Sequence, residues 1–440
     1  MKRAIIVGGG LAGGLTAIYL AKRGYEVHVV EKRGDPLRDL SSYVDVVSSR
    51  AIGVSMTVRG IKSVLAAGIP RAELDACGEP IVAMAFSVGG QYRMRELKPL
   101  EDFRPLSLNR AAFQKLLNKY ANLAGVRYYF EHKCLDVDLD GKSVLIQGKD
   151  GQPQRLQGDM IIGADGAHSA VRQAMQSGLR RFEFQQTFFR HGYKTLVLPD
   201  AQALGYRKDT LYFFGMDSGG LFAGRAATIP DGSVSIAVCL PYSGSPSLTT
   251  TDEPTMRAFF DRYFGGLPRD ARDEMLRQFL AKPSNDLINV RSSTFHYKGN
   301  VLLLGDAAHA TAPFLGQGMN MALEDARTFV ELLDRHQGDQ DKAFPEFTEL
   351  RKVQADAMQD MARANYDVLS CSNPIFFMRA RYTRYMHSKF PGLYPPDMAE
   401  KLYFTSEPYD RLQQIQRKQN VWYKIGRVNT SGDYKDDDDK

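Results

Sequence analysis

The first 31 residues restrict the fold of this chain more than any other segment. An apolar run at 3–7 is followed by Gly-Gly-Gly-Leu-Ala-Gly at 8–13, a helical stretch, and a second apolar run that ends in Glu31. A strand, a glycine-rich turn, a helix and a second strand in this order form a βαβ unit that binds a dinucleotide. A GxGxxG pattern alone also occurs in structural turns, but the two strands and the acidic residue favour nucleotide binding. The unit does not distinguish NAD from FAD.

Each position of the glycine turn has a predicted task. Gly8 allows the tight turn, Gly10 lets the backbone approach a pyrophosphate, and Gly13 lets the helix pack closely on the strand. The helix N-terminus, with Ala12 among the cofactor-binding positions, presents free N–H groups to the phosphates. Glu31 is expected to accept a hydrogen bond from a ribose hydroxyl.

The composition indicates a globular chain with several domains. Its 440 residues are 43% hydrophobic and 25% charged, which allows two or three domains with sizeable cores. Residues 433–440, DYKDDDDK, are an expression tag, and we leave them and the linker 430–432 out of the fold. Because the tag holds five Asp and two Lys, the remaining chain has a net charge of +9 rather than +6, which suits anionic ligands.

Charge, cysteine spacing and hydropathy exclude several classes of function. Lys and Arg are interleaved with acidic residues, which argues against a nucleic-acid partner. The four cysteines are far apart and form no CxxC pair, which indicates a reducing, cytoplasmic environment and argues against a metal site or a redox disulfide. No apolar run reaches about 18 residues, so we expect no transmembrane segment. The basic N-terminus precedes the first strand and is not a signal peptide.

The order of elements predicts an α/β fold, in which a Rossmann-type domain carries an inserted sheet-rich domain and a C-terminal helical region follows. The main elements predicted outside the βαβ unit are strands within 81–98, a helix at 106–124, a strand at 126–130, a hairpin at 143–156, helical residues around 254–281 and a helix at 318–336. We assign the Rossmann-type domain to 1–70, 100–182 and 291–344, the substrate-binding sheet domain to 71–99 and 183–290, and the helical region to 345–429.

Two later segments indicate that the dinucleotide is FAD. Asp306 follows a buried strand, at the sheet edge where ligands of open α/β folds bind, and its carboxylate can accept from a ribityl hydroxyl. The glycine-rich turn after Pro313 starts a helix at Gly318, whose N-terminus can stabilise negative charge on the pyrimidine edge of a reduced flavin. Asp165, in Gly-Ala-Asp-Gly, is a weaker signal, because such turns often cap helices.

These three segments, in this order and spacing, resemble the single-component aromatic hydroxylases that use FAD and NAD(P)H. Within that group the chain is similar to kynurenine 3-monooxygenases over most of its length. The shared segments are RAIGVSMTVRG at 50–60, HGY at 191–193, SSTFHYKGN at 292–300 and ARANYDVL at 362–369. As a whole, the sequence resembles bacterial members of the family that oxygenate an indole ring to an oxindole.

The resemblance implies roles for individual residues. Arg50 and Arg110 match positions that contact FAD, although surface arginines are an alternative, and Leu135 is placed among the cofactor contacts. Met319 and Asn320 match the backbone beside the flavin ring. The substrate-pocket candidates are Arg50, Pro313, Asn365, Tyr366 and Met84, with core packing an equal alternative for Asn365 and Tyr366.

The departures from the kynurenine hydroxylases are informative. The carboxylate-binding Arg of that family appears here as Met84, a neighbouring substrate Tyr appears as Leu97, and the Tyr expected near Ala399 is absent. Without these groups a free amino acid loses its recognition, and the pocket becomes more apolar. A large, flat aromatic or indole substrate fits this change better than kynurenine.

The resemblance implies that NADPH or NADH, bound transiently, reduces FAD, and that O₂ then forms a flavin C4a-hydroperoxide that oxygenates the substrate. No side chain is required as a nucleophile. The alternatives are a flavin halogenase, which carries a Trp-rich motif where this chain has only Trp422, and a nucleotide-sensing module without catalysis. The basic stretch 413–428 is expected to be a packed or solvated helix, with peripheral membrane contact as the less favoured alternative.

Overall fold

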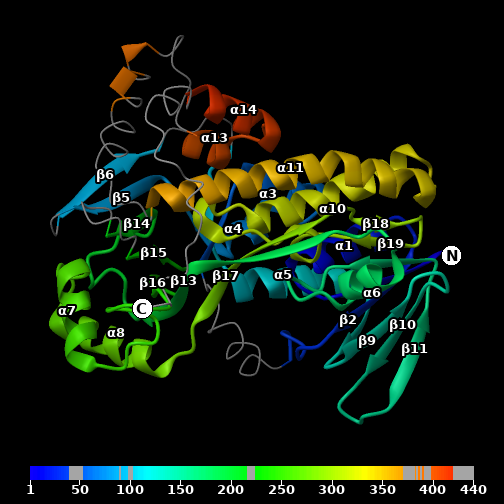
Figure 1. Cartoon of the computed structure of the whole chain (residues 1–440), viewed down its shortest axis with the longest axis horizontal. Coiled ribbons are helices and arrows are strands. Elements are labelled where there is room, and N and C mark those ends of the chain that lie inside the picture. The colour runs from blue at the N-terminus through cyan, green and yellow to red at the C-terminus, as the bar shows by residue number, and fades with distance from the viewer. Residues whose placement is uncertain are drawn as a thin grey trace, which may run out of the picture.

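A computed structural model of the chain shows an α/β molecule with two main sheets (Figure 1). The structure describes residues 1–38, 53–88, 91–97, 103–215, 223–369 and 398–419, with isolated positions between 382 and 390. The first sheet has the strand order β18-β19-β12-β1-β2-β8. Its strands are β1 (Arg3–Val7), β2 (Glu26–Glu31), β8 (Arg127–Phe130), β12 (Met160–Gly163), β18 (His296–Tyr297) and β19 (Val301–Leu303). All neighbours are parallel except β18 and β19, which confirms the Rossmann-type arrangement.

Helices cover this sheet because its central strands are apolar on both faces. The residues of β1 from Ala4 to Val7 and all of β12 are buried. Helix α10 packs against α1 and α3, and α1 also packs against α5. The helices of this domain are α1 (Leu11–Ala21), α3 (Val58–Ala66), α4 (Arg71–Asp75), α5 (Arg110–Leu123), α6 (Ala170–Gly178), α9 (Asp306–His309), the 3₁₀ helix η1 (Pro313–Leu315) and α10 (Gly318–Arg335).

The second sheet has seven strands in the order β17-β13-β16-β15-β14-β5-β6. Its strands are β5 (Ala83–Val88), β6 (Gln91–Glu96), β13 (Phe184–Leu198), β14 (Thr210–Phe214), β15 (Gly224–Thr228), β16 (Val234–Pro241) and β17 (Asn285–Ser292). Helix α8 (Arg269–Ala281) packs on β13 and against α7 (Glu253–Tyr263), and together they bury a separate core rich in phenylalanine. This sheet confirms the sheet-rich unit predicted after residue 183.

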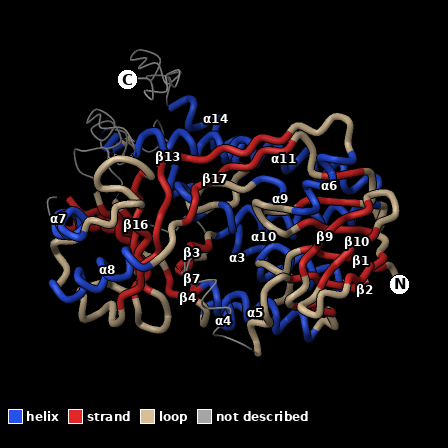
Figure 2. Tube along the Cα trace, turned by 60° about the horizontal axis from the view of Figure 1, so that its bottom comes forward, coloured by secondary structure: helices blue, strands red, loops and turns tan. Residues whose placement is uncertain are grey.

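The strands β13 and β17 connect the two parts of the molecule. In Figure 2 they lie side by side, and β13 pairs first with β17 and then, over 191–198, with β16. The pairing of β13 with β17 shifts register between Phe188 and Gly192. The other end of β17 reaches the first domain, where Val290 N donates to the Ala310 carbonyl at 2.8 Å.

Two small sheets and the C-terminal helices complete the fold. The order β11-β10-β9 joins β9 (Lys133–Asp138), β10 (Ser143–Gln147) and β11 (Pro153–Gln157), and the order β3-β7-β4 joins β3 (Gly53–Met56), β7 (Leu106–Asn109) and β4 (Gly78–Pro80). Helix α11 (Gln340–Leu369) runs alongside α10 in Figure 1 and packs against it. Beyond it lie α13 (Met398–Phe404) and α14 (Tyr409–Gln419), which packs on α11.

The helix predicted at 106–124 begins later than the sequence indicated. Residues 106–109 form strand β7, which pairs with β3 and β4, and the helix starts at Arg110. Asn109 caps it, because its side chain accepts hydrogen bonds from the backbone N–H groups of Ala111 and Ala112, both at 3.0 Å. The apolar residues of β7 continue the helical periodicity, which explains the error.

Candidate cofactor and substrate site

Steric contacts fix the glycine turn between β1 and α1. Gly8 has a φ of +102°, and a Cβ added there would lie 2.3 Å from the Ala164 carbonyl oxygen. A Cβ at Gly13 would lie 1.9 Å from the carbonyl oxygen of Gly8. At Gly10, by contrast, the nearest described atom is Arg33 Nη2, 3.8 Å away. Gly8 and Gly13 therefore serve backbone packing, whereas a Cβ at Gly10 would make only an ordinary van der Waals contact with Arg33.

The N-terminus of α1 has the properties of a phosphate site. Gly10 is its N-cap, and no side chain caps the helix there. The uncapped helix start suits a pyrophosphate group, and the cationic Arg33 lies nearest to Gly10 there. The glycine turn and the uncapped helix start therefore fit the diphosphate of FAD.

Glu31 ends β2 directly beside this turn. Its Oε2 accepts from Gly9 N at 2.8 Å, and its Oε1 accepts from Arg33 N at 2.9 Å and Arg33 Nε at 2.7 Å. Burial acts to raise the pKa of Glu31, but its bonds to Arg33 outweigh burial and hold the pKa below its ordinary value. The carboxylate is thus ionised, and a ribose hydroxyl remains its predicted further partner. Arg33 was not anticipated, although its position two residues after Glu31 is a usable signal.

Asp165 lies against the glycine turn and accepts hydrogen bonds at the start of α6, whose N-cap is Ser169. Its Oδ2 accepts from Ala170 N at 2.7 Å at the start of α6, and its Oδ1 is buried with no hydrogen-bond partner among the described residues. Burial raises the pKa of this carboxyl. Behind it, Arg172 Nη1 donates to the Ala307 carbonyl at 2.7 Å and so joins this segment to α9. A contact from Asp165 to the cofactor stays a prediction.

Asp306 begins α9 at the carboxyl edge of β19, and its side chain is exposed. The preceding Gly305 has a φ of +56°, and a Cβ there would lie 2.9 Å from the Cβ of Ala322. Glycine is therefore required at this turn. An exposed carboxylate at the sheet edge can accept from the hydroxyls of a ribityl chain, as the sequence predicted.

The start of α10 is tied to α3 by Asn320. This fully buried side chain accepts from Thr57 N at 2.8 Å and donates to the carbonyls of Ser55 at 2.9 Å and Gly316 at 3.0 Å. Among the described residues, no side chain caps the N-terminus of α10, which begins at Gly318 and continues with Met319. The helix start can therefore face an anionic group, while the side chain of Asn320 serves the local structure.

An aromatic cluster lies next to η1, between β13 and α11. We define it as Phe189, His191, Phe314 and Tyr366. The Tyr366 ring centroid is 4.8 Å from that of Phe189 and 4.9 Å from that of Phe314, and His191 Nδ1 lies 2.8 Å from Tyr366 Oη. Asn365 Nδ2 donates to the Phe314 carbonyl at 2.9 Å. Asn365 and Tyr366 thus meet the turn that starts at Pro313.

The sequence did not single out the β13 members of the cluster for their chemistry. His191 belongs to the HGY segment shared with the family, but its pairing with Tyr366 depends on the packing of a strand on a distant helix. Burial, aided by the charge of Arg190, lowers the pKa of His191. The imidazole is therefore neutral near pH 7. The surface of the cluster is mainly aromatic and carries no charge.

The remaining candidate residues are dispersed. Met84 lies on β5 and is only 5% exposed, within the main apolar core, and Leu97 is similarly buried. The residue paired with Met84 across the hairpin is Arg95, which forms an ion pair with Glu400 of α13. Arg110 is half-buried at the start of α5, and Leu135 is exposed on β9. Arg50 and Ala399's side chain lie outside the described residues.

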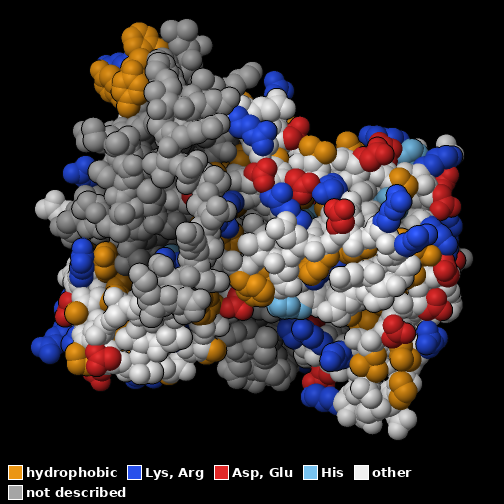
Figure 3. Space-filling model, in the orientation of Figure 1, with side chains coloured by type: hydrophobic (Ala, Val, Ile, Leu, Met, Phe, Trp, Pro, Cys, Tyr) orange, Lys and Arg blue, Asp and Glu red, His pale blue; other side chains and the backbone are white. Residues whose placement is uncertain are grey.

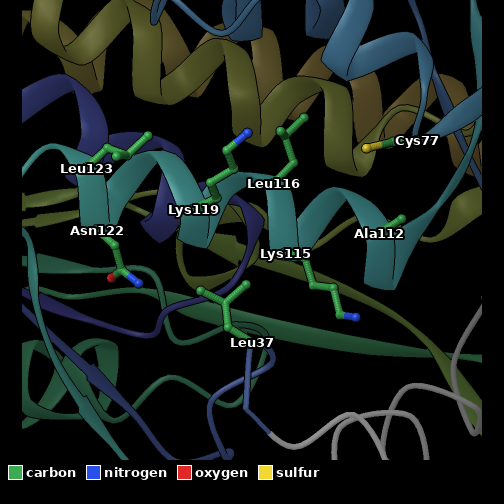
Figure 4. Close-up of a pocket in the computed structure, with 8 residues that line it drawn as sticks. All are labelled: Leu37, Cys77, Ala112, Lys115, Leu116, Lys119, Asn122 and Leu123. Atoms are coloured by element: carbon green, nitrogen blue, oxygen red, sulfur yellow. The ribbon is translucent and has the colours of Figure 1, made fainter.

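A surface hollow of about 570 Å³ lies elsewhere, along α5 (Figure 4). It is lined by Leu37, Cys77, Ala112, Lys115, Leu116, Lys119, Asn122 and Leu123. None of these residues belongs to the glycine turn or to the segments 163–172 and 305–320, so we do not assign the cofactor or the substrate to it. Figure 3 shows Lys and Arg interspersed with Asp and Glu on the visible face of the first domain.

Within the described part of the chain, no cluster of His, Cys, Asp and Glu could hold a metal ion. The same residues contain no helix of the length and hydropathy needed to cross a bilayer. Cys77, Cys134 and Cys239 are unpaired thiols, and burial raises the pKa of Cys77 to about 11 and that of Cys134 to about 12. Such thiols are poor nucleophiles near neutral pH.

Comparison with known proteins agrees with this site. The family described as "FAD binding domain" matches residues 1–343. Kynurenine 3-monooxygenase of Legionella pneumophila (strain Corby) is 31% identical over 421 residues, which cover 94% of this chain and 91% of that protein. The enzyme of the same name from Salinispora tropica is 32% identical over 371 residues, 84% of this chain and 80% of the relative.

Solved structures share the fold at lower identity. A tetrameric form of 2-methyl-3-hydroxypyridine-5-carboxylic acid oxygenase has a TM-score of 0.66 at 20% identity, covering 84% of this chain and 93% of that one. The tetracycline destructase Tet(51) has a TM-score of 0.61 at 18% identity and covers 96% and 98%. These likenesses support the architecture and carry no information on the substrate.

Proposed function

The chain belongs to the FAD-dependent aromatic monooxygenase family that includes kynurenine 3-monooxygenase, and on this premise we propose that it hydroxylates an indole ring. Its cofactor is FAD, with NADPH or NADH as the reductant and O₂ as the co-substrate. The proposed substrate is a bisindole intermediate, hydroxylated at C2 to an oxindole. The sequence as a whole resembles violacein synthase, which catalyses this reaction in violacein biosynthesis. The proposal places the enzyme in the bacterial cytoplasm.

The observation that carries this proposal is the apolar character of β5. Met84 stands where the kynurenine hydroxylases are expected to have a carboxylate-binding Arg, and it is 5% exposed in a continuous apolar core. A methionine offers no bidentate donor to a carboxylate. Arg95, on the paired strand, is held by Glu400. The side chains of this strand favour a planar aromatic substrate over a free amino acid.

Separate elements of the chain have separate roles in the proposed reaction. When bound, FAD supplies the reduction by NAD(P)H and the activation of O₂. The glycine turn holds the diphosphate, Asp306 accepts from the ribityl hydroxyls, and the N-terminus of α10 stabilises negative charge at the flavin edge. The aromatic cluster at η1 excludes water and presents ring faces and edges to an aromatic substrate.

A second candidate, kynurenine 3-hydroxylation, is favoured by a different observation. Relatives with that name are 30–31% identical over 93–94% of this chain. The changes at Met84 and Leu97 argue against it, because a buried apolar pair would have to accept the ammonium and carboxylate groups of kynurenine. Hydroxylation of another aromatic or indole compound is a third candidate. A halogenase is disfavoured, because the chain has one Trp.

The test supplies bisindole pathway intermediates and kynurenine separately, with NADPH and ¹⁸O₂, and follows the products by mass spectrometry. We expect one ¹⁸O atom in an oxindole product, and substrate-stimulated NADPH oxidation only with the indoles. Robust formation of 3-hydroxykynurenine, or NADPH oxidation that yields only H₂O₂ with each indole, would contradict the proposal. The rate of NADPH oxidation by the enzyme without an added substrate is the control.

A further inference from the structure

Beneath the two turns expected to contact the flavin lies a buried cluster of charged side chains. Asp325, on α10, is at its centre and is 0% exposed. Its Oδ2 accepts from Gly305 N at 3.0 Å and lies 2.6 Å from His309 Nε2, and its Oδ1 accepts from Arg351 Nε at 2.7 Å. Asp325 therefore holds the backbone of the Gly305 turn that presents Asp306 at the sheet edge.

The cluster continues from α11 to the C-terminal helices. Arg351 Nη1 donates to Glu324 Oε2 at 3.0 Å, and Arg59 Nη1 donates to the same oxygen at 2.8 Å. The guanidinium carbon of Arg59 lies 3.8 Å from the ring centroid of Tyr409, on α14. Tyr409 Oη then donates to Gln317 Oε1 at 3.1 Å. Gln317 is the N-cap of α10, in the turn next to the expected position of the flavin edge.

The connected residues from Asp325 to Tyr409 therefore end at the two turns that are expected to contact the flavin. Asp325 fixes the Gly305–Asp306 turn, and Tyr409 fixes Gln317 before Gly318. Tyr409 is 0% exposed and Gln317 is 1% exposed, so water does not replace their contact. A change in either end alters the spacing between the ribityl ligand and the helix that faces the flavin ring.

Stability alone does not account for such a set of buried ions. Two carboxylates and two guanidinium groups are taken out of water here, and well-packed apolar residues stabilise a core equally well. Burial acts to raise the pKa of Glu324, yet the charges of Arg59 and Arg351 outweigh burial and lower it. What the ionic arrangement adds is directional geometry, because hydrogen-bonded charges fix positions that apolar contacts leave adjustable.

We propose that Asp325 and Tyr409 are positioning residues for FAD, and that the buried set linking them makes the C-terminal helix α14 a structural part of the flavin site. The inference rests on the expected flavin contacts of Asp306 and Gly318. It is independent of which aromatic compound is hydroxylated.

The first test is Tyr409→Phe, which removes one hydroxyl and keeps the ring over Arg59. We expect the dissociation constant for FAD, measured by titrating apoprotein and following flavin fluorescence, to rise about tenfold, the effect of losing one buried hydrogen bond. The visible absorption bands of the bound flavin should shift as well. Tyr19→Phe is the matched control, because Tyr19 Oη donates to the buried Ser63 carbonyl at 2.5 Å, away from both turns.

Asp325→Asn tests the other end and is expected to weaken FAD binding more than Tyr409→Phe does. Apoprotein melting temperatures separate positioning from folding in both variants. A Tyr409→Phe protein whose FAD dissociation constant stays within about twofold of the parent, with unchanged flavin bands, would overturn the inference. So would an equal weakening in Tyr19→Phe. Because all readouts concern FAD alone, they do not depend on the substrate proposal.

Discussion

The cofactor side and the aromatic cluster of this molecule are built on different principles. At the glycine turn, backbone atoms are so close that a single added Cβ would lie 1.9 Å from a carbonyl oxygen at Gly13. In the cluster, rings of Phe189, Phe314 and Tyr366 pack with centroids 4.8–5.3 Å apart. The first arrangement admits only glycine, whereas the second admits many apolar side chains. We therefore expect backbone geometry to fix cofactor binding, and replaceable side chains to set substrate choice.

The largest effect should come from Gly13→Ala, which breaks the backbone contact between α1 and the turn. We expect this protein to be destabilised by roughly 3 kcal/mol or more and to purify without flavin, because the clash is with backbone that cannot move aside. Gly14→Ala, one residue further along α1, is the control: its Cβ would lie 3.6 Å from the nearest described atom. That variant should bind FAD normally and melt at the same temperature or slightly higher.

Asp306→Ala should have the next largest effect, and on the cofactor alone. The side chain is exposed, so the apoprotein should keep its melting temperature, but the purified protein should be mostly colourless. Asp306→Asn keeps one acceptor oxygen and should retain intermediate flavin content, measured by the ratio of visible to ultraviolet absorbance. Full FAD occupancy in Asp306→Ala would show that the ribityl chain has other ligands.

Acid should weaken the buried cluster in a defined window. Burial acts to raise the pKa of Asp325, but His309 and Arg351 lower it to about 2, below about 3.9 for an unfolded Asp. Because the pKa of Asp325 is lower in the folded protein than in the unfolded chain, the ionised carboxylate adds to the free energy of unfolding above a pH of about 4. This contribution is lost as the pH falls towards 2. The unfolding free energies of apoprotein and of Asp325→Asn should therefore converge over this range. A difference that stays constant with pH would contradict this assignment.

The smallest effect is expected in the aromatic cluster, from Tyr366→Phe. This change removes the hydroxyl that lies 2.8 Å from His191 Nδ1 and keeps the ring. We expect a loss of about 1 kcal/mol in unfolding free energy and an unchanged dissociation constant for FAD. Flavin fluorescence titration measures the dissociation constant for FAD. Weakened FAD binding in this variant would contradict the distinction between the glycine turn and the aromatic cluster.

The sequence predicted the fold around the glycine turn and the FAD cofactor because the constraints there are local, while the individual cofactor contacts stay predictions. Gly8, Gly10 and Gly13 lie within six residues, and Asp306 directly follows an apolar strand, so the motif and the geometry coincide. The βαβ unit, the inserted sheet and the helix starting at Gly318 are all present in the structure.

Contacts between residues far apart in the chain could not be predicted in this way, even where one partner, such as Tyr366, was already a candidate. His191 and Tyr366 are 175 positions apart in the chain, and Tyr409 meets Gln317 across 92 positions. No local pattern encodes such pairs, because they arise from the packing of whole elements. The strand at 106–109 was missed for a related reason: its partners β3 and β4 lie elsewhere in the sequence, and only pairing distinguishes it from the first turn of a helix.

The long strand β13 has a mechanical consequence. Within the seven-stranded sheet, Gly192 and Tyr193 of this strand pair with β17 on one side, and residues 191–198 pair with β16 on the other. The two main parts of the molecule are thus joined by two paired strands, and β17 also donates from Val290 N to the Ala310 carbonyl of the first domain at 2.8 Å. Because a rotation of one part against the other would have to bend both strands, we expect a substrate to enter and leave through local movements of side chains rather than through opening of the two domains.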